Sequence, residues 1–367
     1  MSEFIPVAID CFAGAGGLSR GLTQAGFRIG AAFDNNALAV RTYNRNIGSH
    51  AIVANVEKLS GAQLLAAAGL SQGGCALVAG GPPCQGFSVQ RRGRDDDDRN
   101  LLVMEFLRLV LEIRPLMFLM ENVSSIQGKR GQPLLKELRA RAEIGGYTVR
   151  MEVLDAADFG VPQHRRRLFI VGECEDMCGG FEFPVATHKS TSYATVRQAI
   201  GDLPSPILHP ELCHSFYNHQ PDKISDLNRV RISHVPPGGG RADIPPELRL
   251  PCHRVSVDVA GHRNVYGRLE WDEPAGTITT KCNSFTRGKF AHPEENRNIT
   301  MREAARLQSF PDDFVFEGSK VDVAHQVGNA VPPLLALQLG SALKSALAPR
   351  SDSNRRRIHP RQLSIVL

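Results

Sequence analysis

The first half of the chain alternates short β-rich runs with helical patterns, and this alternation constrains the fold more than any other feature. The β-rich runs hold branched apolar side chains, whereas the segments between them repeat apolar residues at helical spacing. Such a series predicts an α/β fold with a doubly wound parallel sheet, whose ligands bind at the carboxyl ends of the strands. We expect strands at 7–12, 28–34, 51–56, 76–79 and 117–120, with helices within or beside 23–27, 38–46, 101–113 and 133–143.

After this series the composition and the apolar pattern of the sequence change. Apolar runs at 147–154 and 167–172 predict a paired ending to the sheet. The segment 173–297 is rich in Pro, Gly, His and short polar stretches, and its acidic residues slightly outnumber its basic residues. We expect it to form a separate, smaller and loop-rich domain, on which any surface for an anionic partner is local.

Helical patterns return in the last part of the chain. Thr300, followed by Glu303, is typical of a helix start in which the two side chains cap each other. A second helical pattern covers 332–347, and the arginine-rich end of the chain is typical of a solvated tail. These changes predict boundaries that divide the chain into 1–172, 173–297, 298–320, 321–349 and 350–367.

Composition excludes several classes of protein. The 367 residues are 42% hydrophobic and 22% charged, which is ordinary globular usage, and no uninterrupted apolar run approaches the roughly 18 residues of a membrane span. Segment 1–10 lacks the features of an export signal, so we expect a cytoplasmic protein. Eight irregularly spaced cysteines indicate free thiols, and a net charge of +5 permits an anionic partner without selecting one.

A glycine-rich turn directly follows the first expected strand. Gly14, Gly16 and Gly17 lie where backbone amides meet a nucleotide-like ligand in a doubly wound fold. A dinucleotide fingerprint would place glycine at the position of Ser19, which argues against a pyrophosphate ligand. Asp34 ends the second strand and can accept the hydroxyls of a ribose. The turn therefore indicates an adenosine-bearing cofactor, unless its glycines serve only strand–helix packing.

Three further motifs fall at the same expected sheet edge. Cys84 follows two prolines after the fourth strand, a rigid position that suits a nucleophilic thiolate better than a core cysteine. Glu121 ends the fifth strand, so the two side chains are expected to lie close together. Arg165 and Arg167 open a later strand, where alternating guanidinium groups either hold a phosphate or a base carbonyl or form a solvated face.

Taken together, the ordered motifs resemble those of the C5-cytosine DNA methyltransferases, across residues 7–333. The motifs are Phe12-x-Gly14-x-Gly16-Gly17, Pro83-Cys84-Gln85, Glu121-Asn122-Val123, Gln163-x-Arg165-x-Arg167, Arg302-Glu-x-Ala-Arg306-Leu-Gln308-x-Phe-Pro311 and Gln326-x-Gly-Asn329.

The resemblance implies a fold, an activity and a cofactor. It implies a Rossmann-like methyltransferase sheet in a catalytic and cofactor-binding domain at 1–172, a target recognition domain at 173–297, a linking motif at 298–320 and a helix at 321–349 that returns to the catalytic domain. The implied enzyme is a DNA (cytosine-5-)-methyltransferase of the bacterial modification type. It transfers the methyl group of S-adenosyl-L-methionine to a cytosine flipped out of double-stranded DNA, after Cys84 has added to C6 of the base.

The resemblance also implies roles for individual residues. The implied catalytic residues are Cys84, Gln85, Glu121, Asn122, Arg165 and Arg167. The implied cofactor-binding residues are Phe12, Gly14, Gly16, Gly17, Asp34, Asn35, Asn55, Pro82, Leu102, Asn329 and Ala330. The implied DNA-binding residues are Arg91, Arg99, Thr277, Thr279, Thr280, Lys281, Arg287 and Lys289. Many relatives have an aspartate where this chain has Asn55, whose amide oxygen can still accept a hydrogen bond from an adenine amino group.

Some alternatives stay open at this point. An RNA cytosine methyltransferase would share the nucleophile and fold, and a silent DNA-binding relative would share only the fold. A nicotinamide oxidoreductase is disfavoured by Ser19. Cysteines and histidines such as Cys174, Cys213 and Cys252 lack a standard zinc spacing, so we expect no metal. A monomer accompanied by a cognate restriction endonuclease is expected.

Overall fold

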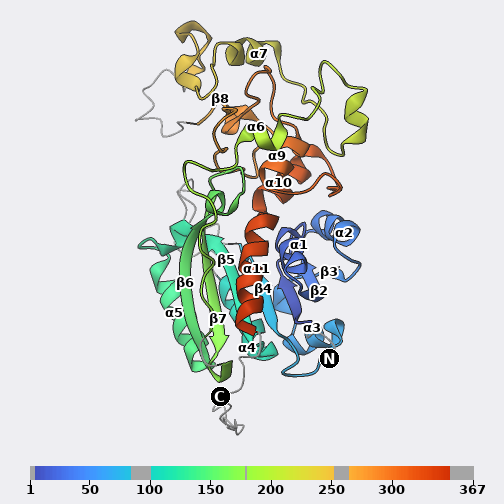
Figure 1. The fold of residues 1–367 in the computed structure, drawn as a ribbon, viewed down its shortest axis with the longest axis vertical. Helices are drawn as coiled ribbons and strands as arrows, with labels where there is room; N and C mark the ends of the chain where they lie inside the picture. The colour runs from blue at the N-terminus through green and yellow to red at the C-terminus, as the bar shows by residue number, and fades with distance from the viewer. Residues whose placement is uncertain (1–4, 84–100, 178–179, 252–263, 348–367) are drawn as a thin grey trace.

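The computed structural model describes residues 5–83, 101–177, 180–251 and 264–347 (Figure 1). Their main element is a seven-stranded sheet with the strand order β3-β2-β1-β4-β5-β7-β6. Strands β1 to β5 pair in parallel, whereas β7 pairs antiparallel with both β5 and β6. The strands are β1 (Val7–Cys11), β2 (Arg28–Asp34), β3 (Ala51–Val53), β4 (Leu77–Gly80), β5 (Met117–Val123), β6 (Tyr147–Asp155) and β7 (Arg166–Cys174).

The predicted doubly wound sheet and its paired ending are confirmed. The expected strand 51–56 is too long, because Asn55 caps a short 3-10 helix at Val56–Lys58 and so ends the extended backbone. Helix α3 is not in the sequence prediction, and the segment 321–349, for which the resemblance implies one helix, holds two helices, α10 and α11. The helices around the sheet are α1 (Gly17–Gln24), α2 (Ala37–Asn46), α3 (Gly61–Ala68), α4 (Leu101–Ile113), α5 (Gln132–Ile144), α10 (Lys320–Asn329) and α11 (Pro333–Leu347).

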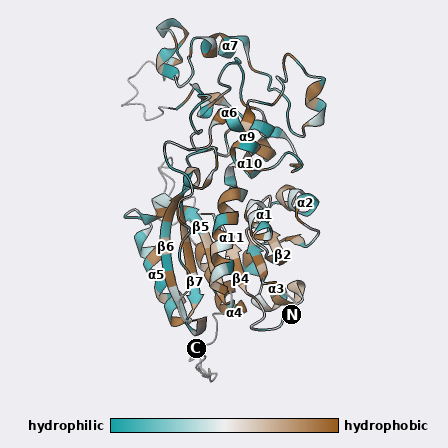
Figure 2. Cartoon of the chain, in the orientation of Figure 1, coloured by the Kyte–Doolittle hydropathy of each residue, from teal (hydrophilic) through white to brown (hydrophobic). Residues whose placement is uncertain are grey.

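Two apolar cores cover the two faces of the sheet. Helices α3, α4 and α5 pack on one face, around Phe106 and Phe118. Helices α1 and α11 pack on the other face, around Leu22 and Leu339. Figure 2 shows the hydrophobic residues concentrated in the sheet and in the helices that cover it. Because parallel strands are buried on both faces, the strands read as apolar runs without alternation.

The segment 320–347 is long and apolar enough to cross a membrane, judged by length and composition only. However, 44% of its most apolar 18-residue stretch is buried inside the fold. It consists of α10 and α11, joined through residues 330–332. Helix α11 packs along α1, and Gly21 approaches Pro333 so closely that a Cβ would meet the carbonyl oxygen of Pro333 at 2.5 Å. Burial against α1 and the sheet therefore accounts for the apolar character of α11.

A further core lies beyond the carboxyl ends of the strands (Figure 1). It joins residues of the 196–299 segment to α9 (Met301–Leu307) and α10, and includes Phe285 and Phe310. Regular structure in this part is short: α6 (Val196–Ile200), α7 (Asp226–Ser233), β8 (Gly267–Arg268) and β9 (Lys289–Ala291). With so little backbone pairing, this core depends on side-chain hydrogen bonds to backbone carbonyls, as Arg268 illustrates by donating to Val235, His292 and Ile232.

A buried ion pair fixes the start of α9. Both terminal nitrogens of Arg297 donate to the Glu303 carboxylate at 2.8 Å, and the two side chains are 2% and 1% exposed. The predicted capping pair of Thr300 and Glu303 is confirmed, with Glu303 accepting from the Thr300 amide at 2.7 Å. Burial opposes ionisation of Glu303, but the hydrogen bonds and charge of Arg297 outweigh it and hold the pKa below its ordinary value.

We predict that Arg297→Met lowers the free energy of unfolding by about 3–5 kcal/mol, because it leaves the Glu303 carboxylate buried without its cation. The ionised pair stabilises the fold above the unfolded pKa of a glutamate and loses this contribution as pH falls through the lowered folded value, so the difference between variant and wild type should shrink in acid. Urea unfolding at several pH values measures it. Arg141→Met, which removes an exposed pair with Glu137, is the matched control, and equal midpoints for both variants contradict the prediction.

Candidate active site

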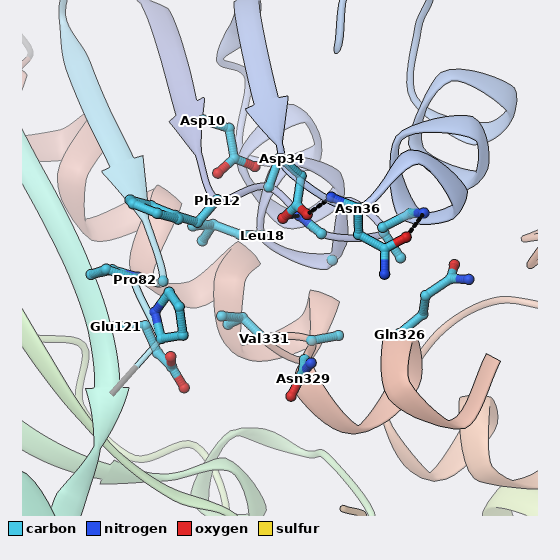
Figure 3. Close-up of a pocket in the computed structure, with 18 of the residues that line it drawn as sticks. Asp10, Phe12, Leu18, Asp34, Asn36, Pro82, Glu121, Gln326, Asn329 and Val331 are labelled. Atoms are coloured by element: carbon cyan, nitrogen blue, oxygen red, sulfur yellow. Dashed lines mark hydrogen bonds between the residues drawn. The ribbon is translucent and has the colours of Figure 1, made fainter. Parts of the chain in front are cut away.

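A cavity of about 540 Å³ opens at the carboxyl ends of β1, β2, β4 and β5. This is the edge at which a doubly wound sheet binds its ligands. Figure 3 shows side chains from the sheet and from the connection between α10 and α11 facing the same space. The predicted site residues that line it are Phe12, Gly14, Gly17, Asp34, Asn35, Asn55, Pro82, Leu102, Glu121, Asn122, Arg165, Arg167, Asn329 and Ala330.

The glycine turn leads from β1 directly into α1. Gly14 has a φ of 53°, and a Cβ at this position would meet no heavy atom within 4 Å, so this part of the turn is open. At Gly17 there is no room for a side chain, because a Cβ there would meet the carbonyl oxygen of Val331 at 2.4 Å. Gly16, with a φ of 94°, is the N-cap of α1 and packs against Tyr43 outside the cavity lining. The turn therefore serves both the cavity and strand–helix packing.

Asp34 is held in place by backbone amides. Its Oδ2 accepts from Gly14 N at 2.9 Å, and its Oδ1 accepts from Asn36 N at 2.8 Å. Burial raises the pKa of Asp34, and the backbone hydrogen bonds oppose this shift in part. Each carboxylate oxygen keeps a lone pair, so the group can accept further hydrogen bonds from hydroxyl donors in the cavity. Asn35 lies between Asp34 and the N-cap of α2, Asn36.

An apolar wall stands beside this carboxylate. Phe12 has a φ of 57°, a left-handed conformation that costs a residue other than glycine about 1–2 kcal/mol. Its ring tilts against Phe33, with centroids 5.5 Å apart, and lines the cavity together with Leu102 from the first turn of α4. Strain of this kind persists where the surrounding structure holds it, as at ligand sites.

The amide of Asn55 is already engaged. Its Oδ1 accepts from Glu57 N at 3.2 Å, and its Nδ2 donates to Glu57 Oε2 at 3.3 Å. Asn55 still lines the cavity. The side chain therefore reaches a ligand only with the hydrogen-bonding capacity that the cap leaves over.

Asn122 connects two of the predicted motifs. Its Nδ2 donates to the carbonyl oxygen of Pro82 at 3.1 Å, and its Oδ1 accepts from Val123 N at 2.9 Å. This buried side chain thereby fixes the backbone shortly before position 84. Four predicted site residues lie outside the described part of the chain: Cys84, Gln85, Arg91 and Arg99.

Glu121 and Arg167 form an ion pair at the carboxyl end of β5. Arg167 Nε lies 3.0 Å from Glu121 Oε1, and the side chains are 16% and 12% exposed. The pairing follows from the antiparallel register, which sets Arg167 opposite Val123 at the carboxyl end of β5. The Arg167 cation therefore stands beside the carboxylate of Glu121, the lining residue labelled in Figure 3.

Arg165 is buried, with 1% of its surface exposed. Its two terminal nitrogens donate to the carbonyl oxygens of Ile278 and Gly328, each at 3.0 Å, while its Nε has no partner among the described residues. Burial, followed by the charge of Arg167, lowers the pKa of Arg165 to about 9. The arginine row is thus no solvated face, and Arg165 ties the cavity to two distant segments of the chain.

The predicted DNA-binding residues that the structure describes lie on one stretch, 277–289. Thr277 Oγ1 donates to the carbonyl oxygen of His164 at 2.8 Å, and Thr279 Oγ1 accepts from Lys281 N at 3.3 Å. Thr280 packs on α10, and Lys281 and Arg287 are exposed. Lys289 Nζ pairs with Glu270 at 2.9 Å, so part of its charge is balanced within the protein.

Several polar residues that line the cavity are not among the predicted site residues, including Asp10, Asn36, His325 and Gln326. Asp10 carries a readable signal, since it is an acidic residue inside the otherwise apolar strand β1. Gln326 belongs to the motif Gln326-x-Gly-Asn329 but received no role, and no motif marks His325; both lie on α10. Among the described residues, no group of three or more His, Cys, Asp and Glu side chains is arranged to hold a metal ion.

Comparisons with known proteins identify relatives of this chain. Residues 7–345 match the family model of the C-5 cytosine-specific DNA methylases. The Type II methylase M.HgiDII of Herpetosiphon aurantiacus is 35% identical over 96% of this chain and 99% of its own length. The Type II methyltransferase M1.HphI of Haemophilus parahaemolyticus is 38% identical over 91% of this chain and 86% of its own length.

Solved structures agree with the sequence relatives. An E. coli protein described as a DNA modification methyltransferase encoded within a prophage superposes with a TM-score of 0.73 at 25% identity, over 93% of this chain and 99% of that one. The Dnmt2 methyltransferase of S. pombe shares the fold with a TM-score of 0.60 at 19% identity, over 93% of this chain and 99% of that one. The chain belongs to the family of C-5 cytosine-specific DNA methylases.

Proposed function

We propose that this chain transfers the methyl group of S-adenosyl-L-methionine to C5 of a cytosine flipped out of a specific double-stranded DNA sequence, through a covalent bond between Cys84 and C6. The observation that carries the proposal is the shared cavity. It joins the glycine turn and Asp34 to the Glu121–Arg167 pair, and Asn122 fixes the backbone that leads into Cys84. A cofactor and a base would therefore meet at one sheet edge.

The residues on one side of the cavity fit an adenosine-bearing cofactor. Asp34 keeps lone pairs for ribose hydroxyls, and Phe12 and Leu102 supply an apolar wall for a purine ring. The open turn at Gly14 leaves room for a ligand beside the backbone. Bound there, S-adenosyl-L-methionine would supply an electrophilic methyl group. Asn55 is a weaker partner for adenine than a free amide, because its oxygen caps the helix at Val56–Lys58.

The other side of the cavity fits a cytosine. The Cys84 thiolate adds to C6 of the ring, which forms a C–S bond and pushes electron density toward N3 and C5. Glu121 holds N3 by a hydrogen bond or donates a proton to it, while Arg167 keeps the carboxyl oriented. C5 would then take the methyl group as its bond to the sulfonium sulfur breaks and a neutral thioether leaves. Water takes the C5 proton, and the bond between C6 and the Cys84 sulfur breaks to return the thiolate. Arg165, whose Nε has no partner among the described residues, and Arg167 would hold the O2 edge of the base and an adjacent phosphate.

The segment 173–297 is the proposed target recognition domain. The catalytic sheet reaches only the flipped base and the cofactor, so flanking bases must be read by chain that projects beyond the sheet edge. Residues 277–289 lie there, held to the catalytic part through Thr277 and Arg165. The Type II relatives support a modification role beside a cognate restriction endonuclease. We propose that the chain works in the cytoplasm and as a monomer.

We predict that Cys84→Ser lowers methyl transfer by at least about a thousandfold while folding and cofactor binding stay intact, because a serine hydroxyl is a far weaker nucleophile. Transfer of tritiated methyl groups to duplex DNA measures the loss. The wild type should also form a denaturant-stable adduct with DNA that contains 5-fluorocytosine, since fluorine cannot leave as a cation. Substantial turnover by the variant, or a gel without the adduct, overturns the covalent step. Transfer to tRNA but not to duplex DNA in a parallel assay would instead support the RNA enzyme.

We predict that Glu121→Gln lowers kcat by about 100-fold or more, but less than Cys84→Ser does. The amide can still contact N3, yet it cannot donate a carboxylic proton as charge develops on the ring. Single-turnover rates measured with saturating DNA and cofactor isolate this step. Glu137→Gln, which changes an exposed carboxylate on α5, is the matched control. Equal rates for Glu121→Gln and wild type remove Glu121 from the mechanism.

We predict that grafting residues 173–297 from a relative of different specificity transfers that specificity. Bisulfite sequencing of DNA from cells that express the active chimera gives the methylated sites. Arg287→Ala should weaken binding to all sequences and flatten its salt dependence if the side chain contacts phosphate, whereas a change at Thr279 should relax preference at one position. An active chimera that still methylates the original site contradicts the assignment of recognition to this segment.

A further inference from the structure

A second pocket, of about 410 Å³, lies beside α7, in the part of the chain beyond the carboxyl ends of the strands (Figure 1). Residues 222–228 form one wall, and residues 283–286, within the stretch 277–289, form the other. Apart from Ile224 and Phe285, every lining residue is polar. We call it the polar pocket, and its polar side chains include Asp222, Ser225, Asn228, Asn283, Ser284 and Thr286.

Hydrogen bonds and an ion pair hold the two walls of the polar pocket together. Asp222 Oδ1 accepts from Lys320 Nζ at 2.8 Å, and its Oδ2 accepts from Asn298 Nδ2 at 3.3 Å. The buried Asn298 also accepts from Phe285 N at 2.7 Å, and so joins one wall to the other. Because Lys320 begins α10, the pocket is fixed to the helix whose end lines the larger cavity.

The amide of Asn228 is oriented by the protein. Its Oδ1 accepts from Tyr266 OH at 2.8 Å and from a terminal nitrogen of Arg231 at 3.1 Å. Because a guanidinium group only donates, the bond from Arg231 fixes which end of the amide is the oxygen. The other end, Nδ2, has two N–H donors and no hydrogen-bond partner among the described residues. These donors are therefore available to a ligand in the pocket.

The opposite wall adds groups that can both donate and accept. The side chain of Asn283 is half-buried and makes no hydrogen bond within the described part of the chain. Ser284 Oγ and Thr286 Oγ1 lie 2.8 Å apart and share one hydrogen bond, which leaves one hydroxyl proton for a ligand. The polar pocket thus holds more hydrogen-bonding capacity than the protein itself uses.

The charges in the lining decide which part of a nucleic acid the pocket suits. DNA phosphates are held chiefly by Arg and Lys side chains, whereas base edges are read by uncharged groups such as Asn, Ser and Thr as well as by Arg. The wall carries the Asp222 carboxylate, balanced by Lys320, and the exposed Lys223 is the remaining cation among the described lining residues. This composition favours the uncharged edge of a base over a phosphate.

Helix α10 limits how far the pocket lies from the flipped base. Lys320 contacts the wall of the polar pocket, and Gly328 lines the larger cavity. A rise of about 1.5 Å per residue separates these two positions by about 12 Å. Duplex DNA rises by about 3.4 Å per base pair, so a base pair at the pocket lies no more than about five positions from the target cytosine.

We propose that the polar pocket reads one purine that flanks the target cytosine, with Asn228 donating to N7 of the base and Asn283 contacting the exocyclic group beside N7. The inference rests on the proposed function and narrows it, because it names a base edge that the segment 173–297 reads. Both purines present N7 as a major-groove acceptor, and pyrimidines lack this atom. The exocyclic group donates in adenine and accepts in guanine, and a free amide can serve either.

The first test is Asn228→Asp. Aspartate keeps an oxygen to accept from Tyr266 and Arg231, but it replaces the two donors with an acceptor. Methylation kinetics are measured on duplexes that carry each base at every position within about five base pairs of the target cytosine. We expect kcat/KM for a purine at one position to fall by about tenfold or more, and cytosine, whose N4 amino group donates, to become the preferred base there.

Gln220→Glu is the matched control. Gln220 is exposed and lies two residues before the wall of the polar pocket, so this variant adds the same charge without changing the lining. We expect its base preferences to equal those of the wild type. Unchanged affinity for S-adenosyl-L-methionine, measured by isothermal titration calorimetry, shows that each variant is folded.

The second test removes the atom on the DNA side. A 7-deazapurine carries C–H in place of N7 and keeps its Watson–Crick pairing. At the position read by the pocket, we expect this replacement to lower kcat/KM of the wild type by about tenfold and to have no further effect on Asn228→Asp, because the donor is already absent. At all other purine positions the replacement should affect both proteins equally.

Asn283→Ala keeps the test decisive if Asn228→Asp does not fold. It removes an amide that makes no hydrogen bond among the described residues, so we expect the fold to be unaffected. Its kcat/KM for the preferred purine should fall by about tenfold, while duplexes with a pyrimidine at that position are methylated as by the wild type. An equal loss on all sequences indicates a phosphate contact and overturns the proposal.

The remaining outcomes separate the pocket from the proposed function. Sensitivity to 7-deazapurines that is the same in wild type and Asn228→Asp at every position overturns the role of the polar pocket, while the methyltransferase activity stands. Wild type that transfers no methyl group to any duplex DNA contradicts the proposed function itself, and the inference falls with it.

Discussion

The antiparallel pairing of β7 with β5 is the constraint on which the cavity depends. In a purely parallel sheet only the carboxyl ends of strands meet at the ligand edge. Because β7 runs in reverse, its beginning lies there instead, and the register sets Arg167 opposite Val123. Two guanidinium groups thereby reach the cavity that holds Glu121. Gly172 permits this register, since a Cβ at that position would overlap the ring of Phe118 at 1.8 Å.

Arg165 extends this constraint to the rest of the molecule. Its hydrogen bonds to Ile278 and Gly328 join the start of β7 to the stretch proposed to read DNA and to the end of α10. Gly328 is packed so closely on that stretch that a Cβ would lie 2.3 Å from the backbone of Thr279. The position of this stretch is therefore set by the same buried cation that lines the cavity. Arg165 therefore supports both the cavity and the stretch proposed to read DNA, so a change at Arg165 would disturb DNA recognition and catalysis together.

The sequence predicted the fold where local signals and tertiary packing agree. The helix at 101–113 matches α4, and Thr300 with Glu303 caps α9, because amphipathic spacing and capping are local properties. The expected strand 51–56 is shorter in the structure, since propensity alone does not reveal that Asn55 turns the chain. The single helix implied at 321–349 is divided into α10 and α11, because Pro332 and Pro333 have no backbone N–H with which to continue the hydrogen bonding of α10.

The sequence predicted those site residues that belong to recognisable motifs. Most of the predicted cofactor residues line one cavity, but Gly16 packs behind it, and Cys84 falls outside the described residues. A motif reveals which residue types occur, but it does not reveal which of their hydrogen bonds are already made within the protein. Asp34 and Asn55 illustrate this, because each accepts a hydrogen bond from a backbone amide two residues further along the chain, and Asp34 accepts another from Gly14 N.

Unsatisfied polar atoms gather where the proposed ligands would bind. Asp10 Oδ1, Arg165 Nε and Gln326 Oε1 are buried without partners among the described residues, and all three side chains line the same cavity. Native structures leave few such groups, because each costs about 1–3 kcal/mol. Burial of apolar side chains in the two sheet cores and in the core beyond the strand ends offsets this destabilisation. Filling these sites with internal partners would stabilise the protein, but it would remove the hydrogen-bonding capacity that a cofactor and a base require.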